Sequence, residues 1–238
     1  MTTKFSKTQI DRLGDRLRKG NLTDADFRLL DEYRRSFGEV YEIVVRAIRE
    51  RLKLEPTGRP AKSTGSIVDK LHRESIRLSQ VQDIAGCRIV VSDVKEQDRI
   101  VGLLLNVFPR ASIVDRRVHT SFGYRAVHVI PRISGKLIEV QVRSLLQHSW
   151  AELSERVSDV FDPAIKYGVG NNMILKILMD NSERVKQIET MEDQILVASE
   201  DRLKLRVLQQ EIIDTKKELV NHLNKLILIV EGREEKKV

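Results

Sequence analysis

The sequence has little cysteine, few aromatic residues and no long apolar run. Cys87 is the single cysteine among 238 residues, which excludes an internal disulfide and favours a reducing compartment. Aromatic residues make up 5% of the chain, so leucine, isoleucine and valine must build the core. No stretch approaches eighteen apolar residues, and the N-terminus lacks the apolar segment of a secretory signal. These absences predict a soluble, cytoplasmic protein with no membrane partner.

Charge, in contrast, is abundant. Charged residues make up 32% of the chain, and the formal net charge is +7. A basic surface favours polyanionic partners such as nucleotides or RNA, but it does not distinguish between them. Apolar residues reach 41%, which is enough for a substantial core.

Helical patterns at both ends enclose a central region with the period of a strand. One helix is expected from Thr23 to Leu52, and a short one from Ser66 to Arg73. Further strands are expected over 87–91, 111–118, 124–133 and 136–143, and further helices over 94–108, 145–160, 172–199 and 201–231. This order predicts an α+β protein in three parts: N-terminal helices (1–55), a core (56–165) and a C-terminal helical extension (166–238).

The last expected helix carries apolar residues close to a seven-residue repeat. Its stripe comprises Leu205, Leu208, Ile212, Leu219, Leu223 and Leu226. Such a stripe can pair with a second copy, which would make the protein a homo-oligomer. It can equally form a hairpin with the helix over 172–199 inside one chain. The sequence leaves both interpretations open.

Residues 136–143, Lys-Leu-Ile-Glu-Val-Gln-Val-Arg, alternate strictly. Their polar face carries Glu139, Gln141 and Arg143, opposite three aliphatic side chains. A carboxylate, an amide and a guanidinium in one row suit a metal and a phosphate. A solvated face with a salt bridge explains the same pattern equally well.

A second carboxylate, Asp83, stands just before the first expected strand. Asp83 and Glu139 on neighbouring strands would offer oxygen ligands to a hard cation such as Mg²⁺. Gly86 would let the backbone approach a ligand closely. Taken alone, Asp83 is explained at least as well as a loop cap.

Basic residues surround the start of the short helix: Arg59, Lys62 and Lys70, together with Ser66. Cations at a helix N-terminus make a phosphate site, although a solvated loop with a serine cap is the commoner case. Arg88 lies within an apolar strand and needs a partner, either a carboxylate or a nucleotide.

Aromatic and imidazole groups follow in the next expected strand. Tyr124, Ala126 and His128 would share one face of it. Tyr124 could stack on a base, and His128 could hold a phosphate or move a proton. A core tyrosine and a hydrogen-bonded histidine are the structural alternatives.

The order of these motifs resembles the synthetase domain of the RelA/SpoT family, over roughly residues 45–160. The matching segments are Lys62-x-x-x-Ser66-Ile67, Asp83-Ile-Ala-Gly-Cys-Arg88-Ile89, Gly123-Tyr124-Arg125-Ala-Val-His128, Glu139-Val-Gln141-Val-Arg143 and His148-x-Trp150-Ala151. Five motifs in order are a far stronger signal than any one alone. The resemblance implies a nucleotidyltransferase-like fold. It also implies transfer of pyrophosphate from ATP to the 3′-hydroxyl of GDP or GTP, which gives (p)ppGpp.

The resemblance also implies a role for each matching residue. Asp83 would bind Mg²⁺, and Glu139 would bind Mg²⁺ or act as a base toward the acceptor hydroxyl. The remaining positions would serve the two nucleotides: Arg59 and Arg88 around the adenine, Lys62, Ser66 and Lys70 on the ATP phosphates, Tyr124 on the acceptor guanine, and Arg125, His128, Gln141 and Arg143 along the acceptor and phosphate side. Either Glu139→Gln or Asp83→Asn is then expected to abolish turnover with little change in melting temperature.

Two departures leave the acceptor open. The family often has Arg-x-Lys before Ser-Ile, whereas two residues separate Arg59 from Lys62, and it often has Lys-Pro-Asn where this chain has the loop 118–122. Some small relatives are toxins that pyrophosphorylate the 3′ end of tRNA. The basic cluster Arg110, Arg116, Arg117, His119 and Arg125 favours that alternative. A third interpretation is an inactive nucleotide- or RNA-binding module that oligomerises.

Overall fold

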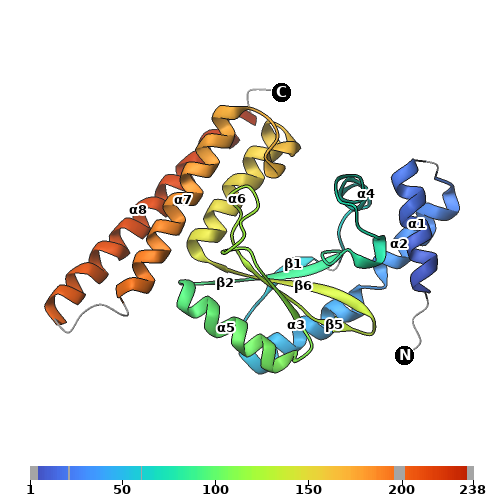
Figure 1. Ribbon diagram of the computed structural model, residues 1–238, viewed down its shortest axis with the longest axis horizontal. Helices are drawn as coiled ribbons and strands as arrows, with labels where there is room; N and C mark the ends of the chain where they lie inside the picture. Colours follow the sequence, from blue (N-terminus) through green and yellow to red (C-terminus); the bar gives the residue numbers. More distant parts are fainter. Residues whose placement is uncertain (1–4, 21, 60, 196–201, 235–238) are drawn as a thin grey trace. The chain divides into compact units, whose positions relative to one another are not determined.

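The computed structural model describes residues 5–20, 22–59, 61–195 and 202–234. Along the sequence, helices precede and follow a central region that contains the strands (Figure 1). In chain order the helices are α1 (Lys7–Lys19), α2 (Asp24–Arg35), α3 (Gly38–Leu52), α4 (Thr64–Arg73), α5 (Val94–Val107), α6 (Leu145–Val160), α7 (Asn172–Ile195) and α8 (Arg202–Glu234), with 3₁₀ turns η1 (Leu78–Gln80) and η2 (Pro163–Tyr167). The strands are β1 (Thr57–Arg59), β2 (Ala85–Val91), β3 (Ser112–Asp115), β4 (Val127–Ile130), β5 (Arg132–Ile133) and β6 (Lys136–Ser144). The predicted α+β class is confirmed.

The chain forms two compact units that interleave along the sequence. Unit 1 comprises residues 1–89, 102–114 and 128–141, and unit 2 comprises residues 90–101, 115–127 and 142–238. Unit 1 therefore contains α1 to α4 and nearly all of the sheet. Unit 2 contains α6 to α8. The predicted three-part division of the chain stays a prediction.

The sheet has the strand order β1-β2-β6-β4-β3, with β5 paired to β6 at its side. β1 and β2 run antiparallel and place Thr57 opposite Arg88. β5 and β6 pair antiparallel as a hairpin. Its turn has φ of 50° at Ser134 and 79° at Gly135, the left-handed pair that matches the twist of two-residue hairpins.

Two predicted strands are shorter than their patterns. The strand expected over 111–118 ends at Asp115, because the Asp115 carboxylate accepts a hydrogen bond from the Arg117 backbone N–H and turns the chain. The strand expected over 124–133 is divided into β4 and β5 at Pro131, which has no N–H to give to a ladder. β4 begins only at Val127, so Tyr124 and Ala126 precede it, and the prediction that Tyr124, Ala126 and His128 share a strand face is wrong.

The first long helix pattern also divides. Thr23 caps α2, where the sequence predicted the helix to begin, and forms a capping box with Asp26. The predicted helix from Thr23 to Leu52 is interrupted at Ser36 and Phe37, where the Phe37 N–H bonds three residues back, to the Arg34 carbonyl. Phe37 is almost fully buried, and Gly38 then begins α3. The break lets the chain turn while the phenyl ring enters the core.

In unit 2 the leucine stripe packs inside the chain. Ile212, Leu219 and Leu223 of α8 are buried in one apolar cluster with residues of α6 and α7. Leu208 is exposed, and the Leu205 side chain lies outside the described residues. The intramolecular alternative therefore accounts for most of the stripe, and a homo-oligomer through these helices stays a prediction. Within the described ranges no helix is long and apolar enough to span a membrane.

Candidate active site

Asp83 forms the centre of a buried charge cluster in unit 1. Lys62 Nζ lies 2.6 Å from Asp83 Oδ2, and Lys70 Nζ of α4 lies 3.0 Å from Asp83 Oδ1. The side chains of Lys62, Lys70 and Asp83 are only 13%, 18% and 20% exposed. Burial alone would raise the pKa of Asp83, but the two ammonium groups outweigh it and lower that pKa to about 2. Asp83 is thus an ionised carboxylate at any physiological pH.

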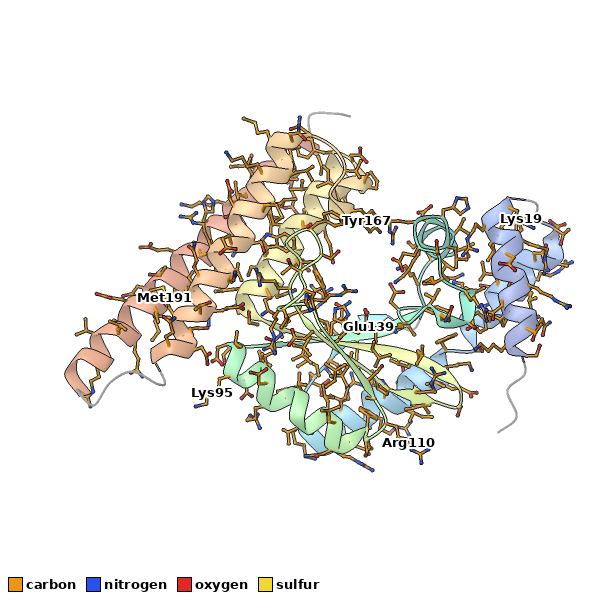
Figure 2. All side chains as sticks on the ribbon, viewed as in Figure 1. Lys19, Lys95, Arg110, Glu139, Tyr167 and Met191 are labelled. Atoms are coloured by element: carbon orange, nitrogen blue, oxygen red, sulfur yellow. The ribbon has the colours of Figure 1, made fainter. Side chains whose placement is uncertain are left out.

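Glu139 of β6 is the second carboxylate of unit 1 and is labelled in Figure 2. His128 Nδ1 of β4 lies 3.0 Å from Glu139 Oε1, and Gln141 Nε2 donates to Glu139 Oε2 at 2.6 Å. Burial opposes ionisation of Glu139, yet the hydrogen bonds and charge of these neighbours lower its pKa, against a smaller opposing effect of Asp83. The polar face of β6 is therefore buried and partnered, not solvated.

Gly86 has a structural use that the sequence did not predict, and its predicted role near a ligand stays a prediction. A Cβ on Gly86 would lie 2.7 Å from the carbonyl oxygen of Glu139, closer than real Cβ atoms come to backbone. The missing side chain thus lets β2 approach β6 at Glu139. This glycine therefore allows the two strands to come close together at the candidate site.

The donor set fits a hard divalent cation held by two protein carboxylates. Asp83 raises the pKa of Glu139, so the two negative charges act on each other, and a cation between such groups relieves their repulsion. Within the described residues there is no group of three histidine, cysteine or acidic side chains that could hold a metal. Mg²⁺ commonly takes one or two carboxylates and completes its shell with water and substrate phosphates. Asp83 would have to exchange its lysine partners for the ion.

Three other residues were predicted to bind ATP: Arg59, Ser66 and Arg88. Ser63, not Ser66, caps α4, and its hydroxyl donates to Ser66 Oγ at 2.7 Å. Arg88 is half-buried on β2. Arg59 pairs with Gly86 through the β1–β2 ladder, and its side chain lies outside the described residues.

A second group of predicted residues gathers in unit 2. The Arg143 guanidinium lies 5.1 Å from the centroid of the Tyr124 ring, and its Nη2 donates to the Tyr124 hydroxyl at 3.2 Å. Arg125 is buried and donates to the Arg117 carbonyl. The stacking partner of Tyr124 in this structure is therefore a guanidinium.

The residues that the resemblance assigned to the acceptor are divided between the two units. His128 and Gln141 contact Glu139 in unit 1. Tyr124, Arg125 and Arg143 belong to unit 2. The alternating pattern of β6 could not predict this division, because it places Glu139, Gln141 and Arg143 on one face but does not determine which residues each of them contacts.

Sequence reasoning missed a buried polar network in unit 2. Ser144 caps α6 in a capping box with Gln147, and both side chains donate to Glu189 of α7, at 2.6 and 2.9 Å. Burial raises the pKa of Glu189 despite these bonds and the charge of Arg125. The Ser-x-x-Gln spacing before an apolar run was the available signal for the cap. Nothing in the sequence indicates that α7 supplies the carboxylate.

Comparisons with known proteins agree with the order of motifs. Residues 58–158 match the profile of the region found in RelA and SpoT proteins. An uncharacterized protein of Mycobacterium tuberculosis is 37% identical over 111 residues, which are 45% of this chain and 41% of that protein. The chain therefore spans about two fifths of the length of the curated relatives it matches first.

Solved structures resemble the fold. A GTP pyrophosphokinase family protein from Streptococcus pneumoniae aligns with a TM-score of 0.52 and 24% identity, covering 81% of this chain and 98% of that one. The small alarmone synthetase 1 from Bacillus subtilis, bound to its product pppGpp, aligns with a TM-score of 0.51 and 24% identity, covering 73% and 97%. Residues 58–158 are thus similar to the region found in RelA and SpoT proteins, and the solved structures show that the fold is similar as well.

Proposed function

We propose that the chain transfers pyrophosphate from ATP to the 3′-hydroxyl of GDP or GTP. The acceptor oxygen forms a bond to the β-phosphorus of ATP, the bond from that phosphorus to the α–β bridging oxygen breaks, and AMP leaves. The hydroxyl proton leaves the acceptor oxygen as the new bond forms. The products are AMP and ppGpp or pppGpp.

The observation that carries the proposal is the pair of ionised carboxylates beside two buried ammonium groups. Phosphoryl chemistry needs little covalent help from a protein; it needs positioning and neutralised charge. Asp83 and Glu139 remain anionic because Lys62, Lys70, His128 and Gln141 surround them. When bound there, Mg²⁺ would neutralise charge on the ATP phosphates.

Lys62 and Lys70 supply the positive charge on the ATP side. In this structure each donates to Asp83, which pre-positions both ammonium groups at one point. An ammonium has three N–H donors, so each lysine can turn toward a phosphate oxygen once Asp83 has another cationic partner. Ser66 and the first turn of α4 add donors on the same segment.

Acceptor binding is assigned to Tyr124, Arg125 and Arg143, with His128 and Gln141 beside Glu139. Arg143 is almost fully buried, and it presents a planar guanidinium against the Tyr124 ring. A guanidinium stacked on an aromatic ring suits both a base and a phosphate. Glu139 is ionised, as either metal binding or acceptance of the hydroxyl proton requires.

The tRNA alternative receives less support than the nucleotide acceptor. It rested on the net charge, the altered loop 118–122 and the basic cluster of Arg110, Arg116, Arg117, His119 and Arg125, and the structure gives carboxylate partners for Arg117. The Arg117 guanidinium lies 2.7 Å from Asp98 and 2.7 Å from Asp115, so its charge is already compensated. An RNA backbone would have to compete with both carboxylates for it.

One assay tests the proposal and its alternatives together. Purified chain is incubated with Mg²⁺ and γ-labelled ATP, and with GDP, GTP or tRNA in separate reactions. We expect label in ppGpp or pppGpp and one AMP per product. Label in tRNA alone would contradict the nucleotide acceptor, and nucleotide binding without turnover in every reaction would indicate an inactive module.

The assay includes two matched variants. Glu139→Gln keeps the side-chain shape and removes the charge, and we expect turnover to fall at least about a hundredfold. Glu155→Gln makes the same change at an exposed position of α6 and should leave turnover unchanged. Wild-type turnover in Glu139→Gln would refute the role of Glu139.

A further inference from the structure

Unit 1 contains a cavity of about 470 Å³, lined by residues from the start of α1, the end of α2, the segment around η1 and the β5–β6 hairpin. Its described lining includes none of the residues assigned to ATP, metal or acceptor. Ligand pockets commonly measure about 300 to 1,000 Å³. The cavity is thus large enough for a small organic ligand and has no use in the proposed reaction.

The wall of this cavity is positively charged. Lys7, Arg132 and Lys136 line it, and the lining described by the structure includes no aspartate or glutamate. The helix α1 begins beside it, capped by Ser6, with no acidic residue in its first turn. The partial positive charge of a helix N-terminus adds to that of the three side chains.

Lys136 is the most constrained of the three cations. Its ammonium donates to the Ser36 carbonyl at 2.7 Å and lies 5.7 Å from the centroid of the Phe37 ring. Burial lowers the pKa of Lys136, with Glu39 opposing it. Two N–H donors of the ammonium are left after the bond to Ser36. An anion beside it would offset the cost of its partial desolvation.

The other part of the wall is aromatic and apolar. The rings of Phe5 and Tyr33 meet edge to face, with centroids 5.9 Å apart, and Ile10 and Leu137 lie in the same lining. Gln82 and Gln80 bring amide groups to the cavity. Aromatic edges and aliphatic groups contact a flat ring well, and amides can bond to its polar edge.

We propose that this cavity is a second ligand site, which binds a small phosphorylated compound with a flat ring, such as a nucleoside monophosphate. The phosphate is bound by Arg132, Lys136 and Lys7, and the ring lies against Phe5 and Tyr33. Arg132 and Lys136 come from the two strands of the β5–β6 hairpin, on either side of its turn at Ser134 and Gly135, and both line the cavity.

Isothermal titration of GMP into the full chain tests the proposal. The non-reacting analogue AMPCPP is present throughout, so that GMP does not report on the ATP site. We expect one GMP per chain in this cavity, in addition to any GMP bound at the proposed acceptor site; the cavity variants below should weaken only the former. Arg132→Gln/Lys136→Gln should weaken GMP binding by about tenfold or more, because each change removes a charged hydrogen-bond donor. Synthesis from ATP and GDP by this variant, measured without GMP, should stay unchanged.

Two further variants control for disturbed packing and for the change in net charge. Lys7→Glu/Arg132→Glu alters only exposed side chains, so loss of binding there cannot come from disturbed packing around Phe37. Lys19→Gln/Arg28→Gln lowers the net charge by the same amount as the first variant, at exposed positions outside the cavity; Lys19 is labelled in Figure 2. Equal GMP affinity in all four proteins, or no GMP binding to the wild type, would overturn the site. Binding of inorganic phosphate as tight as that of GMP would overturn the ring contact.

Discussion

Asp83→Asn should be costly for stability as well as for activity. The carboxylate holds two ammonium groups, of Lys62 and Lys70, in a place where little water reaches them. An asparagine keeps the shape of the side chain but removes the charge. The variant would leave two nearly buried cations without their anion, which is the expensive way to break a buried ion pair.

The magnitude follows from the pKa of Asp83. That pKa is about 2, against an ordinary value of 3.8. A difference of this size corresponds to about 2 kcal/mol in favour of the folded, ionised state. For a chain of this length 1 kcal/mol shifts the melting temperature by about 2–4 °C, so we expect a loss of about 4–8 °C at pH 7. The sequence-based expectation of little thermal change therefore needs correction for Asp83.

The direction of the pKa shift determines how the contribution of Asp83 to stability changes with pH. The folded pKa lies below the unfolded one, so the contribution of Asp83 is fully present above about pH 4 and disappears as the pH falls through about 2. The difference in melting temperature between wild type and Asp83→Asn should accordingly be constant from pH 5 to 7. It should shrink as the pH falls below about 4.

Differential scanning calorimetry of both proteins across this range measures the effect. Asp69→Asn, an exposed position on α4, is the matched control and should melt like the wild type. Equal melting temperatures of wild type and Asp83→Asn at pH 7 would refute the argument, since the two lysines would then gain nothing from the carboxylate. A gap that persists undiminished at pH 2 would refute the assignment to ionised Asp83.

Three other changes test separate parts of the structure. Gly123→Ala should cost about 1–3 kcal/mol in urea denaturation, because Gly123 has φ of 86° and a Cβ would lie 2.8 Å from the Trp150 ring; a loss under about 0.5 kcal/mol would contradict this. Glu189→Gln should gain thermal stability relative to wild type as the pH rises from 4 to 8, because the raised pKa of Glu189 means that its ionisation destabilises the fold. Glutamine keeps an oxygen that can accept from Ser144 and Gln147. A difference in melting temperature that does not change with pH would count against this prediction. Tyr124→Phe keeps the ring and removes the hydroxyl that accepts from Arg143, so it should change the KM for GDP less than about threefold, whereas Tyr124→Leu should raise it by about tenfold or more if a base stacks on the ring; equal effects would mean that it does not.

Much of the local structure was predictable from sequence. Strict alternation over 136–143 predicted the strand β6. The α6 boundaries agree with the pattern from Leu145 to Val160, and Thr23 caps its helix as expected. Each of these features depends on neighbours within a few residues, where backbone propensity and side-chain period act directly.

The partners of the charged residues were not predictable in the same way. The sequence by itself determined that Asp83, Glu139 and two lysines occur in a family-like order. Only the tertiary structure paired Asp83 with Lys62 and Lys70, placed His128 against Glu139, and put Arg143 over Tyr124. The leucine stripe, too, left its partner open until α8 packed against α6 and α7. Periodicity records which side of an element is polar or apolar, but which group meets it depends on contacts between residues far apart in the chain.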